Sequence, residues 1–236
     1  TKGNVFLRVA QIDCFREKRL QLTQNTIAAK LSNTVQVLRR SLHDNPQLRQ
    51  DEQMKKVIAS LISSIDKVYE ADSVEEIIGI EGYCAQSYFS VFDRLITAPD
   101  SPFQFSCRIK HPPLDPVNAL LSFVYTLATT EYAAALETVG LDSYIGFCHT
   151  LRSGRVSLAC DLLEEARCIV ERFVLTMLNL RILNENDFEQ QISGAVLLNA
   201  EGRKKVLTRW QERKRTDMVH PFLKQKIPTG LLPYIQ

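Results

Sequence analysis

Along most of this chain, apolar residues recur at intervals of three and four, the spacing that gathers them on one face of an α-helix. The clearest stripe lies between residues 13 and 42 and consists of Ile27, Leu31, Val35, Leu38 and Leu42. Glycine accounts for only 9 of the 236 residues, which disfavours the glycine-rich folds that bind nucleotides. The pattern therefore predicts an all-α fold, with strands over only a few residues.

Capping and breaking residues divide this pattern into successive helices. Ser73 and Glu76 have the spacing of a capping box, and Asp115 with Pro116 supplies an N-cap and a first-turn proline. The predicted helices cover about 13–42, 47–69, 73–96, 117–139, 157–183 and 203–218. Residues 97–114, with four prolines, form a loop too long to be a mere connector. We also predict a short helix after Asp187, a turn near 194–202 and an extended tail.

The start of the chain carries a different pattern. Residues Val5 to Val9 are predicted to form a short strand that ends a sheet lying upstream. The chain begins at Thr1 with neither an initiator Met nor a signal peptide, so we expect it to begin partway through a longer protein. It has no run of 18 apolar residues, which predicts no membrane span. Six cysteines without a CxxC pair are typical of reduced thiols inside a cell.

Two polar residues lie where an amphipathic helix alone would not place them. Glu81 is surrounded by small and apolar residues, and a carboxylate in such a place needs a partner such as a metal cation. An arginine would serve equally well. His149 follows Gly146 in a predicted turn, which allows a ligand to approach closely. A single histidine is, however, also a common structural residue.

A pair of carboxylates follows His149 by 12 and 15 residues. Asp161 and Glu164 are three residues apart, so both lie on one face of a predicted helix. Together with an imidazole, carboxylates suit Mg²⁺ or Mn²⁺, whereas zinc is disfavoured because no second histidine or cysteine pair has ligand spacing. The alternative is an acidic first turn that complements the helix dipole.

Four segments, in this order, carry a resemblance to one family. They are IEGYCAQSYFSVFD, HPPLDPVNALLSFVYTL, GFCHTLRSGRVSLACDLLEEAR and RKKVLTRWQERKR. Over nearly its whole length, the chain resembles the CRISPR-associated integrase/endonuclease, the first Cas protein of the spacer-acquisition (adaptation) module. Residues 111–127 and the GLLP tail look closest to subtype I-C.

The resemblance implies two domains and a metal site. Residues 1–12 would be the end of an N-terminal β-rich domain and its linker, and residues 13–236 a helical, metal-dependent catalytic domain. Matched by motif, the residues that bind Mg²⁺ or Mn²⁺ and carry catalysis would be Glu81, His149 and Glu164. Asp161 and Asn118 match supporting polar positions, although Asn118 at a helix start could simply make a local hydrogen bond.

The resemblance also implies a reaction and partners. A 3′-hydroxyl of spacer DNA would attack a phosphodiester at the edge of the CRISPR repeat, so that catalysis is mainly positioning and electrostatics. The same site would cleave branched DNA. The implied partners are double-stranded and branched DNA, a second copy in a homodimer, and the small ferredoxin-like second Cas protein. The implied location is the prokaryotic cytoplasm, away from the membrane.

The formal net charge of +2 conceals an uneven distribution. Residues 201–226 hold nine basic and three acidic residues, whereas residues 70–100 hold seven acidic residues and one basic residue. We interpret this as an acidic metal pocket beside a basic DNA-facing surface, although a charge run can also be a solvated helix face. The predicted DNA contacts are Arg152, Arg155, Arg203, Lys204, Arg213 and Arg215.

Two other functions remain open at this point. One is a helical scaffold that binds DNA or a protein without catalysis. The other is a stand-alone repair nuclease for branched DNA.

Overall fold

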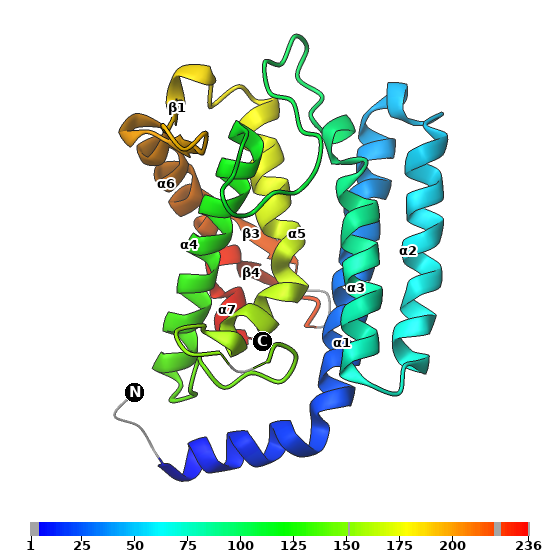
Figure 1. Cartoon of the computed structure of the whole chain (residues 1–236), viewed down its shortest axis with the longest axis vertical. Coiled ribbons are helices and arrows are strands. Elements are labelled where there is room, and N and C mark those ends of the chain that lie inside the picture. The colour runs from blue at the N-terminus through cyan, green and yellow to red at the C-terminus, as the bar shows by residue number, and fades with distance from the viewer. Residues whose placement is uncertain (1–4, 151, 220–222, 236) are drawn as a thin grey trace.

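The computed structural model describes residues 5–150, 152–219 and 223–235 (Figure 1). Most of this chain is helical, which confirms the main feature of the predicted fold class. The helices are α1 (Val5–Asp44), α2 (Glu52–Glu70), α3 (Val74–Phe89), α4 (Pro116–Thr138), α5 (Ser157–Asn179), α6 (Ala200–Arg215) and α7 (Leu232–Ile235). Single 3₁₀ turns cover Pro46–Leu48, Phe92–Leu95, Glu185–Asp187 and Thr229–Leu231.

The helices form two groups that share one hydrophobic core. Helices α1, α2 and α3 pack against one another, and α4 packs against α5, α7 and strand β2. The groups meet where α1 packs against α5, and Figure 1 shows them side by side. The fully buried residues Leu38, Ile77 and Leu120 come from both groups. A side chain on α1, α3 or α5 can therefore face the boundary between them.

The predicted strand at Val5 to Val9 is wrong, because these residues form the first turns of α1. A tertiary contact stabilises the helix there. The amide of Gln11 donates to the carbonyls of Asp142 and Ile145, 2.9 Å each, and accepts from the Asp142 N–H. The described part of residues 1–12 thus contains no β remnant, and residues 1–4 lie outside the described residues.

The strands of the structure occur near the C-terminus instead. One hairpin pairs β1 (Phe188–Gln190) with β2 (Val196–Leu198), and a second pairs β3 (Asp217–Val219) with β4 (Lys226–Pro228); both are antiparallel. The first hairpin replaces the short helix predicted after Asp187. The tail, predicted to be extended, contains β4 and α7.

Helix α4 lies inside this fold. Among the described residues it is the one helix that is long and apolar enough to cross a membrane. It packs instead against α5, α7 and β2, and Leu121 and Val124 are fully buried there. These contacts are those of a core helix.

Candidate metal centre

Three predicted metal ligands meet between the two groups of helices. Glu81 follows Ile77 by four residues and precedes Cys84 by three, which places it on the buried face of α3. Glu164 lies on α5 with only 4% of its side chain exposed, and its Oε1 is 4.0 Å from Nε2 of His149. The carboxylates of Glu81 and Glu164 contact the same Lys30 ammonium, so Glu164 lies between the imidazole of His149 on one side and the carboxylate of Glu81 on the other.

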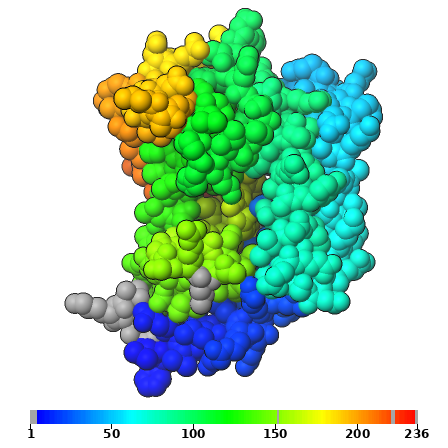
Figure 2. Space-filling model, viewed as in Figure 1, coloured from blue at the N-terminus to red at the C-terminus, as the bar shows by residue number. Residues whose placement is uncertain are grey.

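The three side chains line one cavity of about 440 Å³. Its walls come from α1, α2, α3, α5, the loop before α4 and the loop that carries His149. Figure 2 shows the surface hollowed between α3 and the segment around α4, with α5 at the floor. The charged residues of the wall are Lys30, Glu81, Arg108, Lys110, Glu164, Arg167 and Glu171.

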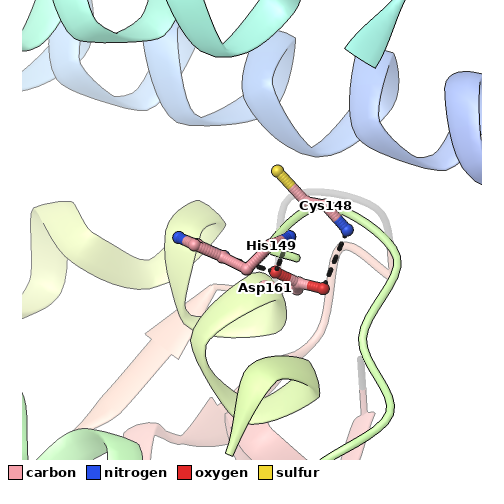
Figure 3. A group of neighbouring side chains, drawn as sticks. All are labelled: Cys148, His149 and Asp161. Carbon is pink, nitrogen blue, oxygen red and sulfur yellow. Dashed lines mark hydrogen bonds and ion pairs between the residues drawn. The ribbon is translucent and has the colours of Figure 1, made fainter. Parts of the chain in front are cut away.

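Asp161 supports the loop that carries His149 (Figure 3). Its fully buried carboxylate accepts hydrogen bonds from the N–H groups of Phe147, Cys148 and His149, at 2.7, 2.9 and 3.0 Å. It also lies 2.6 Å from Nδ1 of His149. This contact suits a proton on Nδ1 and leaves Nε2, the nitrogen nearer Glu164, able to bind a metal.

The close approach of Asp161 to the His149 loop requires a glycine at position 146. A Cβ at this position would lie 2.4 Å from Oδ2 of Asp161 and 2.9 Å from the backbone carbon of Ser157. A larger residue would therefore push the loop away from the carboxylate. The local sequence GFCH, with Asp161 following His149 by 12 residues, builds the turn that the sequence predicted.

Cys148, His149 and Asp161 also form a possible metal-binding group, with ligand atoms within 4.8 Å of one another. Their other contacts argue against that use. Both oxygens of Asp161 already accept hydrogen bonds, and burial, with the nearby carboxylates of Asp161 and Glu164, raises the pKa of the Cys148 thiol to about 12. Oxygen ligands also suit hard divalent cations better than a sulfur ligand does, which favours the set Glu81, His149 and Glu164.

Glu164 remains ionised in spite of its burial. Burial by itself raises the pKa of its carboxyl, but the charges of Arg167 and Lys30 lower it well below its ordinary value. Nη2 of Arg167 donates to Oε1 of Glu164 at 2.7 Å. Glu164 is thus an anion that a divalent cation can bind at neutral pH.

A buried polar layer supports Arg167 from behind. Its guanidinium lies 4.9 Å from the ring centre of Tyr125, whose hydroxyl donates to Glu171 at 2.6 Å. None of these residues was predicted from the sequence. Arg167 follows Glu164 by three residues and Glu171 follows Arg167 by four, so they lie on the same side of the helix. This is a weak signal, because the polar face of any amphipathic helix has the same spacing.

Asn118 lies beside this layer rather than in the cavity wall. It is fully buried, accepts from Arg108 at 2.7 Å and from the Ile109 N–H at 2.9 Å, and donates to the Cys107 carbonyl at 2.8 Å. Because these bonds use both ends of the amide, Asn118 holds the loop that presents Arg108 to the cavity.

The predicted DNA-binding residues lie outside the cavity. Arg152 is exposed, and Arg155 contacts Thr150 and Ser157 in the same turn as His149. Arg203, Lys204, Arg213 and Arg215 all belong to α6, which packs through Trp210 against Phe173 of α5. The cationic residues of the cavity wall were not predicted from the sequence, and they are Lys30, Arg108, Lys110 and Arg167.

Comparisons with known proteins agree on one family. A family model described as CRISPR associated protein Cas1 matches residues 1–212. A curated relative, CRISPR-associated endonuclease Cas1 2 of Rhodospirillum rubrum, is 44% identical over 99% of this chain and 69% of its own length. The chain thus spans about two thirds of that relative.

Two solved structures have the same fold. A casposase bound to an integration product superposes with a TM-score of 0.82 at 24% identity, over 97% of this chain and 65% of its own. A chain of a partial Cas6-RT-Cas1–Cas2 complex gives 0.78 at 25% identity, over 98% of this chain and 66% of its own. The two-group helical fold is therefore shared with both.

Proposed function

The chain belongs to the Cas1 family of CRISPR-associated proteins, and we propose that it is the catalytic part of a metal-dependent DNA endonuclease and integrase of CRISPR adaptation. In this reaction the 3′-hydroxyl of spacer DNA attacks a phosphodiester at the repeat edge. The new phosphodiester forms as the old one breaks, and the leaving strand departs with a 3′-hydroxyl. The observation that carries the proposal is the convergence of Glu81, His149 and Glu164 in one cavity.

The donor set fits Mg²⁺ or Mn²⁺. Two carboxylates and one imidazole are ligands that these cations accept, and the cavity leaves room for a phosphodiester beside them. When bound, the metal would polarise the scissile phosphate and stabilise the charge that develops on it. Zinc is less favoured, because two carboxylates and one imidazole are a harder donor set than the cysteine- and histidine-rich sites that zinc prefers.

The other residues of the site position these ligands and the DNA. Asp161 orients the imidazole of His149, and Arg167 holds the carboxylate of Glu164. Arg108 and Lys110 bring positive charge to the cavity wall, where a phosphodiester would enter. Arg152, Arg155 and the basic residues of α6 would contact the duplex farther from the scissile bond.

The partners and location follow from the same proposal. One structural relative is a chain of a Cas6-RT-Cas1–Cas2 complex, which supports a complex with the small second Cas protein. A homodimer, double-stranded and branched DNA substrates and a place in the prokaryotic cytoplasm complete the proposal. Because this chain spans about two thirds of its relatives, these statements concern the full-length protein.

Strand joining by the full-length protein with Mg²⁺ or Mn²⁺ tests the proposal. Glu81→Ala, His149→Ala and Glu164→Ala should each reduce the joining rate about 100-fold or more, because each removes a ligand. The control is Glu75→Ala, on the same helix as Glu81 but 73% exposed, which should keep the rate. Full activity in all three ligand variants would refute the metal centre.

The same assay separates the two alternatives. Joining that requires the second Cas protein and a repeat-bearing target argues against a stand-alone repair nuclease. DNA binding without any joining or cleavage by the wild-type protein would favour the non-catalytic scaffold.

A further inference from the structure

Lys30 occupies an unusual place for a lysine. It lies on the inner face of α1, three residues after Ile27 and four before Thr34, and is only 9% exposed. Its Nζ is 2.6 Å from Oε2 of Glu164 and also pairs with Oε1 of Glu81. The ammonium therefore bridges carboxylates from two different helices, α3 and α5.

Those carboxylates are two of the three ligands in the proposed metal centre. Lys30 contacts one oxygen of each carboxylate, so a divalent cation bound by both would lie only a few ångströms from the ammonium, and two cations that close repel each other strongly in a largely buried site. We propose that Lys30 is a built-in competitor for the metal: it holds the two carboxylates together in the metal-free protein and is displaced when the metal binds. This inference rests on the proposed metal-dependent function.

The charges of the site explain why a competitor would be present. Two carboxylates held this close in a largely buried site repel each other unless a cation lies between them. Lys30 and Arg167 supply two positive charges against the negative charges of Glu81 and Glu164. These four groups are thus neutral together and keep their geometry without metal.

Lys30 is the cation that can leave. Arg167 is held on the same helix as Glu164 and lies against the ring of Tyr125. Lys30 has a flexible four-carbon side chain and borders a cavity of about 440 Å³ into which its ammonium can move. After displacement, it would remain tethered beside the metal as an added positive charge for a phosphodiester.

The test compares Lys30→Met with the wild type in the full-length protein, using Mn²⁺ titration followed by electron paramagnetic resonance. Removing the competitor should tighten Mn²⁺ binding at least tenfold, about 1.4 kcal/mol. The metal-free variant should melt about 5 °C or more below the wild type, because two buried carboxylates lose their shared cation. Added Mn²⁺ should recover that loss.

The matched control is Lys110→Met. Lys110 lines the same cavity but forms no ion pair among the described residues. Equal tightening in both variants would show a general charge effect and overturn the proposal, as would an unchanged or weaker affinity in Lys30→Met. If Lys30→Met does not fold, Lys30→Gln, which removes the charge but keeps a polar side chain, should give the same direction of change.

A further variant separates this inference from the proposed function. Glu81→Gln should weaken Mn²⁺ binding in the wild-type and Lys30→Met backgrounds. If Mn²⁺ binds and depends on Glu81 but ignores Lys30, only the competitor role fails. If no variant binds Mn²⁺, the metal centre itself fails, and the competitor role fails with it.

Discussion

The substitution Asp161→Asn tests how Asp161 supports the loop that carries His149, because it changes one atom of a carboxylate that has four donor contacts. In the wild type, Oδ2 accepts from the N–H groups of Phe147 and Cys148, and Oδ1 faces the N–H and Nδ1 of His149. An asparagine must turn an NH₂ toward one of these pairs. The two hydrogen bonds of that pair are then lost, because their donors face the NH₂ of the asparagine, which is itself a donor.

The magnitude follows from those bonds. A hydrogen bond to a charged group contributes about 1.5–3 kcal/mol, so two lost bonds lower the unfolding free energy by about 3–6 kcal/mol. In a chain of this size each kcal/mol corresponds to roughly 2–4 °C of melting temperature. Because the imidazole loses its orienting partner, Mn²⁺ affinity should also fall about 10–100-fold.

Urea unfolding and Mn²⁺ titration measure these effects, and Asp51→Asn provides the control. Asp51 caps α2 by accepting from the Met54 N–H at 3.0 Å and also pairs with Arg94 near the surface. Asparagine caps a helix nearly as well as aspartate, and a pair at the surface contributes about 1 kcal/mol or less. The control should therefore lose about 1 kcal/mol or less. An Asp161→Asn variant as stable as the control would refute the four-contact account of the loop.

Two further substitutions and one labelling experiment test the packing of the site. Gly146→Ala should lower the unfolding free energy by about 2–3 kcal/mol, because its Cβ would collide with Asp161. Gly79→Ala, in α3, should raise the unfolding free energy by about 0.5–1 kcal/mol, because nothing lies within 4 Å of its added Cβ. If urea unfolding shows the Gly146 variant to be more stable than the Gly79 variant, the close contact at Gly146 is contradicted. At pH 8 a thiol reagent should modify exposed Cys14 far faster than buried Cys148, which with a pKa of about 12 is thiolate in about one molecule in ten thousand. Comparable rates by peptide mapping would contradict that burial.

The helices were predictable because their signals are local. The capping serine of α3 accepts from the Glu76 N–H as the capping-box spacing predicts, and Asp115 does the same for α4. The N-terminal strand failed for the opposite reason. Val5–Val9 has strand-forming residues, but the contacts of Gln11 that stabilise α1 there reach residues more than 130 positions away.

The residues of the candidate site also differ in whether local sequence signals could predict them. Glu81, His149 and Glu164 could be proposed from motif resemblance and from the i, i+3 pair on α5. Lys30 could not, because its partners are 51 and 134 residues distant and such separations leave no periodicity. Its one local signal was a lysine on the apolar face of a helix, where a buried anion is the expected partner.

Local charge explains how a nearly neutral chain could present the proposed site for a polyanion. Three carboxylates and four cationic side chains line the cavity, and these are Glu81, Glu164, Glu171, Lys30, Arg108, Lys110 and Arg167. The wall thus carries about one net positive charge before any metal binds. A divalent cation that displaces Lys30 without expelling it would raise that charge to about three, because the ammonium stays within the cavity. In that case metal binding itself makes the site attractive to phosphodiesters, so the affinities for metal and DNA should increase together.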